Sequence, residues 1–249
     1  MLTDERYSII LKLLNESGIV KTQDLITELN CSESTIRRDL DHLEQAGFLK
    51  RIHGGAKRIY RLDEELTTKE KSLKNIQEKT TIGKFSASLL QENDVIFLDA
   101  GTTTLSIIDF IKVGNITVVT NGIEHASLLA DYGIDTILLG GKIKFSTKAI
   151  VGSTSLSELS NYQFDKAFIG INGIDLEFGC TTPDPEEAAI KKLVLKQSSN
   201  NYVVADKTKW NKVNFVKVCE LEDVTIITDE SDIDLTSFKE KTTILEATS

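Results

Sequence analysis

The chain has 249 residues, of which 40% are hydrophobic and 27% charged, and its formal net charge at pH 7 is −9. This is the composition of a globular protein long enough for two domains. The longest apolar runs have the length of a strand, well short of the roughly 20 residues of a membrane helix, and the N-terminus lacks the apolar core of a secretory signal. Three widely separated cysteines without CxxC spacing disfavour a disulfide framework or a zinc site. We therefore expect a cytoplasmic protein.

The charge is unevenly distributed along the chain. Residues 1–60 hold nine Lys and Arg and nine Asp and Glu, so the remaining 20 basic and 29 acidic residues carry the whole −9. Between Ser34 and Arg58, six basic residues stand against three acidic ones. A local positive excess in an acidic protein is typical of a nucleic-acid binding surface.

Three short helical patterns occupy the first 47 residues. Apolar residues at positions 7, 10, 11 and 14 have helical spacing, and Gly18 is expected to end this helix. Thr22 suits the N-cap of a second helix, and Ser32 suits the N-cap of a third. A tight turn between the second and third helices predicts a helix-turn-helix.

The third predicted helix has the features of a helix that reads the major groove of DNA. The side opposite its apolar residues carries short hydroxyls followed by two arginines, Ser34, Thr35, Arg37 and Arg38. Arginine can bind guanine with two hydrogen bonds or hold a phosphate. The alternative is that both arginines simply lie on a solvated helix face.

The stretch FLKRIHGGAKR, residues 48–58, follows this helix and predicts a wing, a hairpin with glycines at its tip. Glycines allow close approach to the sugar-phosphate backbone, while lysine and arginine supply positive charge. The predicted DNA contacts of the wing are Lys50, Arg51, His53, Gly54 and Gly55. The histidine can either contact phosphate or pack beside the glycines.

From residue 79 onward, short runs rich in β-branched residues alternate with helical patterns. The predicted strands are Val95–Leu98, Ile116–Val119, Thr136–Leu139, Ala167–Ile171, Tyr202–Ala205 and Val224–Ile227. This alternation predicts an α/β domain with a largely parallel sheet between helices. Ligands of such sheets bind at the carboxyl ends of the strands.

The first predicted strand runs directly into DAGTTT, residues 99–104, which opens a helix. Asp99 is followed by Gly101 and the hydroxyls of Thr102, Thr103 and Thr104. A glycine and hydroxyl groups at a helix N-terminus offer hydrogen-bond donors that suit a phosphate group. The alternative is that the threonines only cap the helix.

Other strand ends offer polar groups for a bound sugar. These candidates are Thr120, Asn121, Gly140, Gly141, Lys142, Gly170 and Asn172. The Gly-Gly pair can equally be plain turn chemistry. The segment TPDPEE, residues 182–187, fixes a loop before a helix that begins near Glu186. Within this segment, Asp184 and Glu187 can accept from sugar hydroxyls or serve only as acids at the helix start.

The order STIRRDLDHLEQAGFLKRIHGGA closely resembles the winged helix of the DeoR family of bacterial sugar-metabolism repressors. Six later segments resemble that family's sensor domain: LDAGTTT, VTNG, LLGGK, AFIGINGID, TTPDPEEAAIKK and VVADKTKW. The resemblance implies a winged helix-turn-helix at residues 1–57, a linker at 58–74 and a phosphosugar sensor at 75–249. It also implies a sensor fold similar to sugar-phosphate isomerases of the ribose-5-phosphate type.

The resemblance implies operator DNA and a phosphorylated sugar as partners, and a homo-oligomer, either a dimer or a tetramer. The segment TTPDPEEAAIKK looks most like fructose-operon repressors, whose effector is fructose-1-phosphate, with tagatose-6-phosphate or another ketose phosphate as the alternative. Asp206 and Lys209, with Lys207 between them, resemble the family's Asp-x-x-Lys, in which one lysine completes the phosphate site or pairs with Asp99. The family usually has an arginine four residues before an asparagine and eight before a lysine, where this sequence has Lys71, Asn75 and Lys79, so the bidentate fork of the arginine is lost.

Enzymatic chemistry finds less support in the sequence. A sugar-phosphate isomerase needs a carboxylate base, and Asp99, Asp184 and Glu187 are candidates. An N-terminal winged helix nevertheless favours a ligand-gated repressor over an enzyme. The histidines at positions 42, 53 and 125 form neither a nucleophile-base-acid pattern nor a metal-ligand cluster. We therefore expect no catalytic residues, no metal and no cofactor other than the effector.

Overall fold

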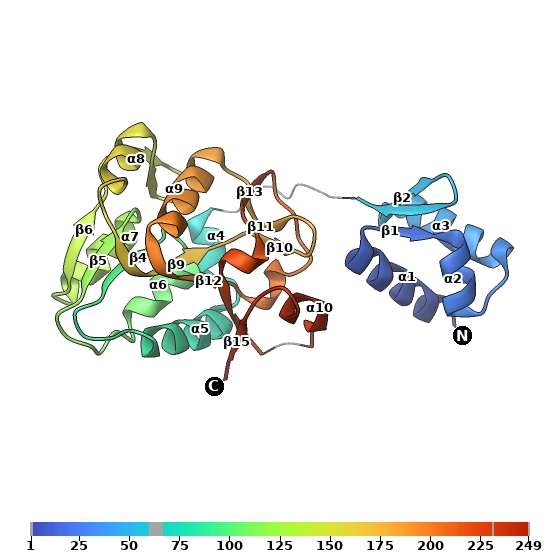
Figure 1. Ribbon diagram of the computed structural model, residues 1–249, viewed down its shortest axis with the longest axis horizontal. Coiled ribbons are helices and arrows are strands. Elements are labelled where there is room, and N and C mark those ends of the chain that lie inside the picture. The colour runs from blue at the N-terminus through green and yellow to red at the C-terminus, as the bar shows by residue number, and fades with distance from the viewer. Residues whose placement is uncertain (1, 60–66, 231, 249) are drawn as a thin grey trace. The chain divides into compact units, whose positions relative to one another are not determined.

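The computed structural model describes residues 2–59, 67–230 and 232–248. Two compact units, residues 1–61 and 62–249, have separate hydrophobic cores (Figure 1). The predicted linker, residues 58–74, lies partly outside the described residues, from 60 to 66, and its last part forms helix α4, Thr68–Ser72. None of the helices described is long and apolar enough to cross a membrane.

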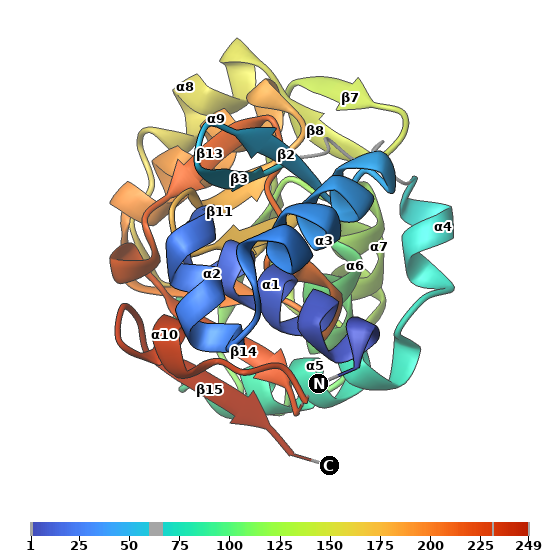
Figure 2. The same ribbon diagram turned by 90° about the vertical axis from the view of Figure 1, so that its right-hand side faces the viewer.

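The N-terminal unit is a winged helix. Its elements are α1 Thr3–Ser17, β1 Ile19–Lys21, α2 Thr22–Leu29, α3 Glu33–Gln45, β2 Leu49–Ile52 and β3 Gly55–Arg58. The strands pair antiparallel in the order β1-β3-β2. Figure 2 shows α1, α2 and α3 facing the viewer, with the hairpin of β2 and β3 beside them. The winged helix-turn-helix predicted from sequence is therefore confirmed.

Short local signals set the ends of these helices. Gly18 follows α1 with a φ of 69°, a conformation that glycine adopts easily. Ser32 is the N-cap of α3, and its Oγ accepts a hydrogen bond of 3.3 Å from the N–H of Thr35. Both predictions are confirmed. Thr22, expected at the N-cap of α2, is instead its first residue, because Lys21 holds the N-cap as the last residue of β1.

The C-terminal unit is built on a seven-stranded parallel sheet in the order β15-β14-β12-β9-β4-β5-β6. Its strands are β4 Val95–Leu98, β5 Thr117–Thr120, β6 Asp135–Leu138, β9 Phe164–Gly170, β12 Ser198–Val204, β14 Thr225–Asp229 and β15 Ile244–Ala247. Each of the six predicted strands overlaps one of these strands, so the α/β prediction is confirmed. The edge strand β15 was not predicted.

Helices cover both faces of the sheet (Figure 1). One face packs against α5 Ile76–Ser88, α6 Thr102–Ile108 and α7 Ile123–Asp131, and the other against α8 Ser153–Leu159, α9 Pro185–Lys196 and α10 Thr236–Lys239. Smaller elements complete the unit: hairpin β7 Lys142–Lys144 with β8 Ala149–Val151, an antiparallel sheet of β10 Gly173–Asp175, β11 Gly179–Thr182 and β13 Val216–Cys219, and turns η1 Lys207–Lys209 and η2 Leu221–Asp223.

The strand order reverses between β4 and β9. From β4 the chain proceeds to β5 and β6 on one side, and from β9 it proceeds to β12, β14 and β15 on the other. The loops that follow β4 and β9 therefore diverge, which leaves a crevice at their carboxyl ends. Asp99 directly follows β4, and Gly170 is the last residue of β9. The fold thus places the predicted phosphate loop at this crevice.

Candidate functional site

The exposed side of α3 carries the residues predicted to contact DNA. Ser34, Arg37 and Arg38 are exposed, and Thr35 is half-buried. Arg37 forms an ion pair of 2.5 Å with Glu33 one turn earlier, and both side chains are mostly exposed. An exposed pair of this kind is weak, so Arg37 can exchange it for a contact with DNA.

Helix α3 is joined to α1 by a fork of two hydrogen bonds. The Nε of Arg6 donates to Oδ2 of Asp39 at 2.7 Å, and its Nη2 donates to Oδ1 at 3.0 Å. Asp39 is buried, whereas Arg38 beside it is exposed. This bidentate pair fixes the position of α3 in its unit while its opposite side stays open to solvent.

The wing consists of β2, β3 and the turn between them. Gly54 lies in this turn with a φ of +80° and open space around it. Gly55 is buried instead, and a Cβ added to it would lie 2.0 Å from the carbonyl oxygen of Val20. The glycine at position 55 is therefore required by the packing of β3 on β1, a structural reason that the sequence prediction did not include.

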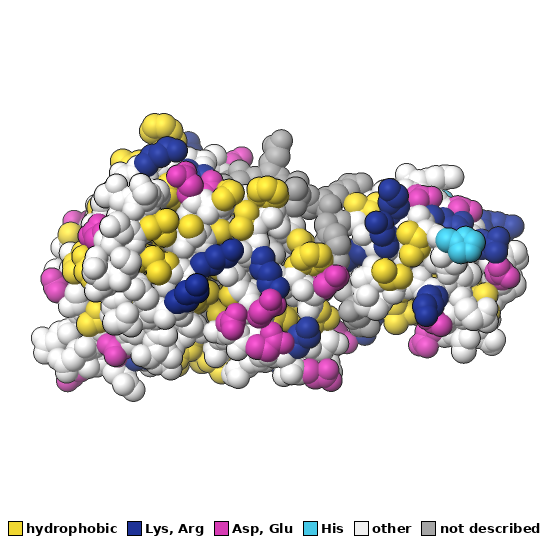
Figure 3. All heavy atoms as spheres, turned by 45° about the horizontal axis from the view of Figure 1, so that its top comes forward, with side chains coloured by type: hydrophobic (Ala, Val, Ile, Leu, Met, Phe, Trp, Pro, Cys, Tyr) yellow, Lys and Arg dark blue, Asp and Glu magenta, His cyan; other side chains and the backbone are white. Residues whose placement is uncertain are grey.

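The basic residues of the wing differ in their surroundings. Lys50 and His53 are exposed. Arg51 is half-buried and forms an ion pair with Asp41 of α3, while its N–H donates to Oε1 of Glu44 at 2.7 Å. Figure 3 shows basic side chains and a histidine close together on the visible face of this unit. Acidic side chains, among them Glu33 and Asp41 of α3, lie beside these basic residues, and contact with DNA by the wing and α3 stays a prediction.

The C-terminal unit has a cavity of about 330 Å³ at the crevice between the ends of β4 and β9. Its lining includes six lysines and three carboxylates: Lys71, Lys74, Lys79, Lys191, Lys209 and Lys212, with Asp99, Glu187 and Asp206. The formal charge of this lining is therefore +3, in a chain whose net charge is −9. A cavity with this excess attracts an anion.

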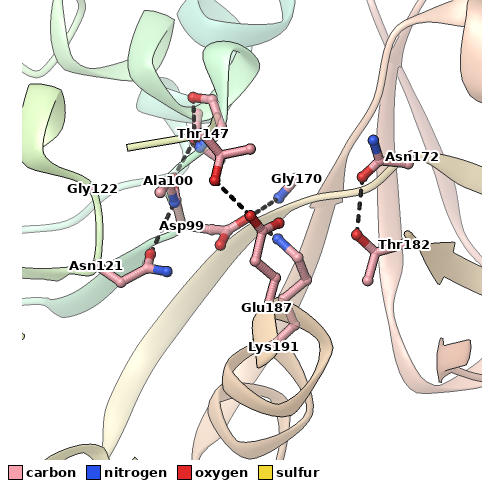
Figure 4. Close-up of polar contacts among 12 residues, drawn as sticks. Asp99, Ala100, Asn121, Gly122, Thr147, Gly170, Asn172, Thr182, Glu187 and Lys191 are labelled. Atoms are coloured by element: carbon pink, nitrogen blue, oxygen red, sulfur yellow. Dashed lines mark hydrogen bonds and ion pairs between the residues drawn. The ribbon is translucent and has the colours of Figure 1, made fainter. Parts of the chain in front are cut away.

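Asp99 forms a buried ion pair with Lys191 of α9 (Figure 4). The Nζ of Lys191 contacts Oδ2 of Asp99, and the N–H of Gly170 donates to the same oxygen at 3.0 Å. The exposed fractions of Lys191 and Asp99 are 4% and 3%. The pair therefore joins α9 to the ends of both β4 and β9.

Glu187 lies one helical turn before Lys191 and also lines the cavity. Its Oε1 accepts from Oγ1 of Thr147 at 2.7 Å (Figure 4). The same oxygen accepts from Nζ of Lys144 at 3.2 Å. Burial acts to raise the pKa of Glu187, but Lys191, Thr147 and Lys144 outweigh it, so the pKa lies below its ordinary value. Glu187 is therefore ionised at neutral pH.

The loop after β4 is fixed by hydrogen bonds within the protein. The N–H of Ala100 donates to Oδ1 of Asn121 at 2.9 Å, and the N–H of Gly101 donates to Oγ1 of Thr104 at 3.0 Å. Thr102 and its neighbour at position 103 begin α6 and line the cavity. Because the first N–H groups of a helix have no acceptor within it, they are available to an anion at this end of the cavity.

Asp206 follows β12 and is 1% exposed. Its Oδ1 accepts from the N–H of Thr208 at 2.9 Å, and its Oδ2, which has no hydrogen-bond partner among the described residues, lies 3.6 Å from Nζ of Lys209. Burial acts to raise the pKa of Asp206, but Lys209 and Thr208 outweigh it and lower it. Asp206 is thus an ionised, almost completely buried member of the cavity lining.

The two units match two domain models of one family. Residues 6–61 match the DeoR-like helix-turn-helix domain, and residues 74–230 match the DeoR C terminal sensor domain. The chain belongs to the DeoR family. The resemblance seen in the sequence is therefore confirmed, and the chain is a DeoR-family transcriptional regulator with a winged helix and a sensor domain.

Curated members of the family are similar over almost their whole length. The HTH-type transcriptional regulator FruR of Bacillus subtilis, described as uncharacterized, is 46% identical over 98% of this chain and 98% of its own. The HTH-type transcriptional regulator GlpR of Haloferax volcanii is 35% identical over 96% of this chain and 94% of its own. The lactose phosphotransferase system repressor of Staphylococcus epidermidis is 33% identical over 92% and 93%.

Solved structures with a weaker likeness include ribose 5-phosphate isomerase A of Methanocaldococcus jannaschii. It is 19% identical, covers 55% of each chain and has a TM-score of 0.40. The eIF2B delta subunit of Chaetomium thermophilum is 12% identical and covers 59% of this chain and 57% of its own, with a TM-score of 0.42. Likeness at this level carries no argument about the activity of this DeoR-family chain.

The structure brings part of the predicted effector site together. The predicted residues that line the cavity are Asp99, Gly101, Thr102, Thr103, Gly170, Asn172, Glu187, Asp206 and Lys209. They come from the ends of β4, β9 and β12 and from the first turns of α6 and α9. Their convergence follows from the parallel sheet, in which all carboxyl ends lie at one edge.

The remaining predicted residues lie outside the lining: Thr104, Thr120, Asn121, Gly140, Gly141, Lys142, Asp184 and Lys207. The hydroxyl and amide groups at 104, 120 and 121 bond to backbone groups of the strand-end loops. A Cβ at Gly141 would lie 2.3 Å from Oγ of Ser155, so this glycine has a packing role. Asp184 caps α9, which is the alternative left open by the sequence.

The lysines of the predicted site form ion pairs with carboxylates other than Asp99. Lys207 lies 3.6 Å from Glu78, Lys209 lies 3.6 Å from Asp206, and Lys142 lies 3.5 Å from Glu186. Asp99, for which the sequence suggested a lysine at 207 or 209, is paired with Lys191 instead. The reason is that Lys191 projects from the second turn of α9 toward the end of β4.

Several lining residues were missed by the sequence-based prediction. They are Lys191, Thr68, Lys74, Thr147, Thr208 and Lys212. Lys71, Asn75 and Lys79 also line the cavity, and the sequence had marked them as positions of a family pattern without including them in the predicted site. The signal for Lys191 was its place in AAIKK, close behind the predicted Glu187. The described residues contain no group of three or more His, Cys, Asp or Glu arranged to hold a metal ion, and Cys31, Cys180 and Cys219 are free thiols.

Proposed function

We propose that this DeoR-family regulator represses a sugar-utilisation operon in the cytoplasm and is released from its operator by a phosphorylated sugar. The observation that carries the proposal is the cavity with six lysines and three carboxylates at the switch between β4 and β9. A phosphate group supplies the negative charge that this lining favours, and the carboxylates accept hydrogen bonds from sugar hydroxyls.

The arrangement of charge favours one orientation of the ligand. Burial lowers the pKa of Lys79, and nearby Lys209 and Lys71 act in the same direction, whereas Asp206 opposes them. These three lysines and one carboxylate leave a positive excess on the side of the cavity formed by α4, α5 and η1. The opposite side, with Asp99 paired to Lys191, is balanced. We place the phosphate at the lysine-rich side and the sugar hydroxyls at the balanced one.

Fructose-1-phosphate is the effector that we propose. The support is the likeness of TTPDPEEAAIKK to fructose-operon repressors, together with the 46% identity to a regulator named FruR. A second candidate is tagatose-6-phosphate or another ketose phosphate, because a lactose phosphotransferase system repressor is 33% identical over almost the whole chain. The two candidates differ in hydroxyl stereochemistry and phosphate position, which a polar pocket distinguishes through its hydrogen bonds.

We propose that the sensor domain binds this sugar without converting it. An isomerase base must be free to take a proton from the substrate carbon. Asp99 is instead held by Lys191 and the N–H of Gly170, and Glu187 is held by Thr147 and Lys144. Both carboxylates therefore serve the structure of the cavity in the proposal, and the chain needs neither a metal nor a further cofactor.

On the DNA side, we propose that α3 enters the major groove and that the wing contacts the backbone beside it. One winged-helix unit with nearly balanced charge, nine basic and nine acidic residues over positions 1–60, binds weakly by itself. Two or four copies in a dimer or tetramer raise the affinity through effective concentration, because each bound head holds the next near its half-site. The proposed partners are thus operator DNA, a phosphosugar and further copies of the same chain.

Isothermal titration calorimetry of the full chain with four ligands tests the sensing part of the proposal. The ligands are fructose-1-phosphate, tagatose-6-phosphate, fructose-6-phosphate and free fructose, at one salt concentration. We expect saturable binding of fructose-1-phosphate and none of free fructose, because the lysines require the phosphate. Preference for tagatose-6-phosphate would identify the second candidate, and equal binding of free fructose would contradict a phosphate site.

A further inference from the structure

The segment Thr68–Asn75, which we call the α4 segment, forms one wall of the cavity. It consists of α4 and the turn into α5, and Thr68, Lys71 and Lys74 from it line the cavity. In the chain it lies nine positions after Ile59, where the described part of the winged-helix unit ends. A ligand in the cavity therefore contacts the part of the sensor domain that is nearest in sequence to the DNA-binding unit.

The α4 segment contributes no side chain to the hydrophobic core of its domain. None of the residues of α4 is buried, and Leu73 directly after it is 72% exposed. Thr68 makes two hydrogen bonds of 2.9 Å, from its N–H to the carbonyl of Ser146 and from its Oγ1 to the carbonyl of Thr147. A helix with no buried side chain opens at low cost in free energy, so the strength of its remaining hydrogen bonds decides whether it stays docked.

Lys79 supplies the hydrogen bonds at the other end of the segment. Its Nζ donates to the carbonyl oxygen of Lys71 and, at 2.7 Å, to the carbonyl oxygen of Lys74. These carbonyls lie at the end of α4 and in the turn that follows it, where the carbonyl of Lys71 also accepts from the N–H of Lys74 at 3.2 Å. Lys79 itself is 7% exposed, and Oγ of Ser106 in α6 donates to its carbonyl at 2.7 Å. Lys79 thus links the rigid part of the domain to the α4 segment.

An ammonium group has three N–H donors, and two of those on Lys79 go to the α4 segment. Lys79 also lines the cavity, so its third donor is available to a group bound there. Burial lowers the pKa of Lys79, with Lys209 and Lys71 adding to this effect. An anion in the cavity would favour the charged ammonium, which is the form that donates to the α4 segment.

We infer that Lys79 is the positioning residue that couples an anion in the cavity to the docking of the α4 segment. The anion accepts from Lys79 and attracts the side chains of Lys71 and Lys74, so the docked segment is stabilised when the cavity is filled. By linkage, a docked segment must raise the affinity for the anion by the same factor. The inference rests on the proposed function for the identity of the anion, and it adds the element that responds.

The first experiment needs no ligand. Hydrogen exchange of the backbone amides in the α4 segment is measured in the full chain for wild type, Lys79→Met and Lys84→Met, the last changing an exposed lysine on the same helix. Loss of two hydrogen bonds should speed exchange in the segment about tenfold or more in Lys79→Met and leave Lys84→Met unchanged. Equal exchange in wild type and Lys79→Met would overturn the inference and leave the proposed function untouched.

The second experiment adds fructose-1-phosphate, or inorganic phosphate as the simplest anion. In wild type we expect slower exchange in the α4 segment with either anion, and none of this protection in Lys79→Met. Lys79→Arg keeps a positive charge and hydrogen-bond donors, so it should recover part of the protection of the α4 segment by the anion. A wild-type segment that ignores both anions would overturn the inference. Protection by phosphate with no release of operator by any phosphosugar would instead contradict the proposed function alone.

The coupling itself is read from operator release. Lys79→Met should still bind operator DNA but lose the shift in affinity on adding the phosphosugar, whereas Lys84→Met should retain it. Thr68→Val, which removes the hydrogen bond to the carbonyl of Thr147, provides a second route if Lys79→Met folds poorly, and it should weaken the shift in the same direction. If Lys79→Met and Thr68→Val both kept the full change in operator affinity on adding the phosphosugar, the inference would be overturned.

Discussion

Lys191 of α9 and Asp99 at the end of β4 form an ion pair that is almost completely buried. The N–H of Gly170, at the end of β9, donates to the same carboxylate, so three elements of the fold meet at one oxygen. Because β4 and β9 are the strands between which the sheet reverses its order, this pair lies where the cavity opens. The pair therefore holds α9 against the ends of β4 and β9 at the proposed effector site.

Removing one partner of this pair should destabilise the domain strongly. In Lys191→Met the carboxylate of Asp99 stays buried without its cation, which typically costs about 3–5 kcal/mol. We expect a clear fall in the midpoint of urea unfolding of the full chain. The matched control is Lys192→Met, since Lys192 is the exposed neighbour on the same helix. Equal midpoints for the two variants would show that the pair contributes nothing to stability.

Replacement of an arginine on α3 should lower the affinity for operator DNA and also reduce the dependence of that affinity on salt. Arg38→Ala removes an exposed cation from the proposed groove-reading face, so the slope of log affinity against log salt should fall by about one. Arg37→Ala should act in the same direction. Fluorescence anisotropy on DNA from upstream of the chain's own gene, at several salt concentrations, measures both quantities. Unchanged slope and affinity in both variants would place the DNA surface elsewhere.

Thr103→Ala separates sensing from DNA binding. Thr103 lines the cavity at the first turn of α6, far in sequence from the winged helix. Loss of one hydrogen bond to a charged phosphate should weaken effector binding about tenfold or more, with no change in operator affinity. Calorimetry with the phosphosugar and anisotropy with DNA check the two halves. Thr80→Ala, an exposed threonine on α5, serves as control, and a full response in Thr103→Ala would remove this loop from the site.

Because His125 is buried, we expect the free energy of unfolding to depend on pH. Burial lowers the pKa of His125 from 6.5 to about 4 in the folded chain, so the folded state keeps it neutral. Its Nε2 lies 3.0 Å from Oγ1 of Thr104, which fixes the loop after β4. The unfolded chain binds a proton near pH 6.5, so stability present above that pH is lost as pH falls toward 4, by about 3 kcal/mol in all.

His125→Asn should remove this part of the pH dependence. Urea unfolding of wild type and variant at pH 7 and pH 5 gives the comparison, because other titrating groups are common to both proteins. We expect wild type to lose about 2 kcal/mol more than the variant between these pH values. Identical losses would mean that His125 titrates normally in the folded chain.

Strong local patterns account for the parts of the fold that sequence could predict. Burial of one helix face gives α1 to α3 their amphipathic spacing, and burial of whole strands gives β4, β5, β9 and β12 their apolar runs. Both patterns are visible in the sequence. The strand β15, Ile244–Ala247, is short and half-buried, and β11, Gly179–Thr182, is polar in sequence although it is buried. Their conformation depends on tertiary neighbours, which no local pattern encodes.

The site was predictable only where the rule for parallel sheets applies. Asp99, Gly170 and Asp206 follow strands, so the common carboxyl edge brings them together. Lys191 lies inside a helix in the sequence KK, which has the pattern of a solvated helix face, and only the packing of α9 shows that it is buried. The α4 segment lies almost wholly inside the predicted linker, residues 58–74, and its place at the cavity is a tertiary contact.

The most direct test of the account is fluorescence anisotropy of the full chain on DNA from upstream of its own gene, at fixed salt. The complex is titrated with fructose-1-phosphate, tagatose-6-phosphate, fructose-6-phosphate and free fructose. The account predicts tight binding to DNA and release by one phosphosugar, fructose-1-phosphate, with no effect of free fructose. Tight binding that ignores all four ligands would contradict the proposed sensing role of the cavity.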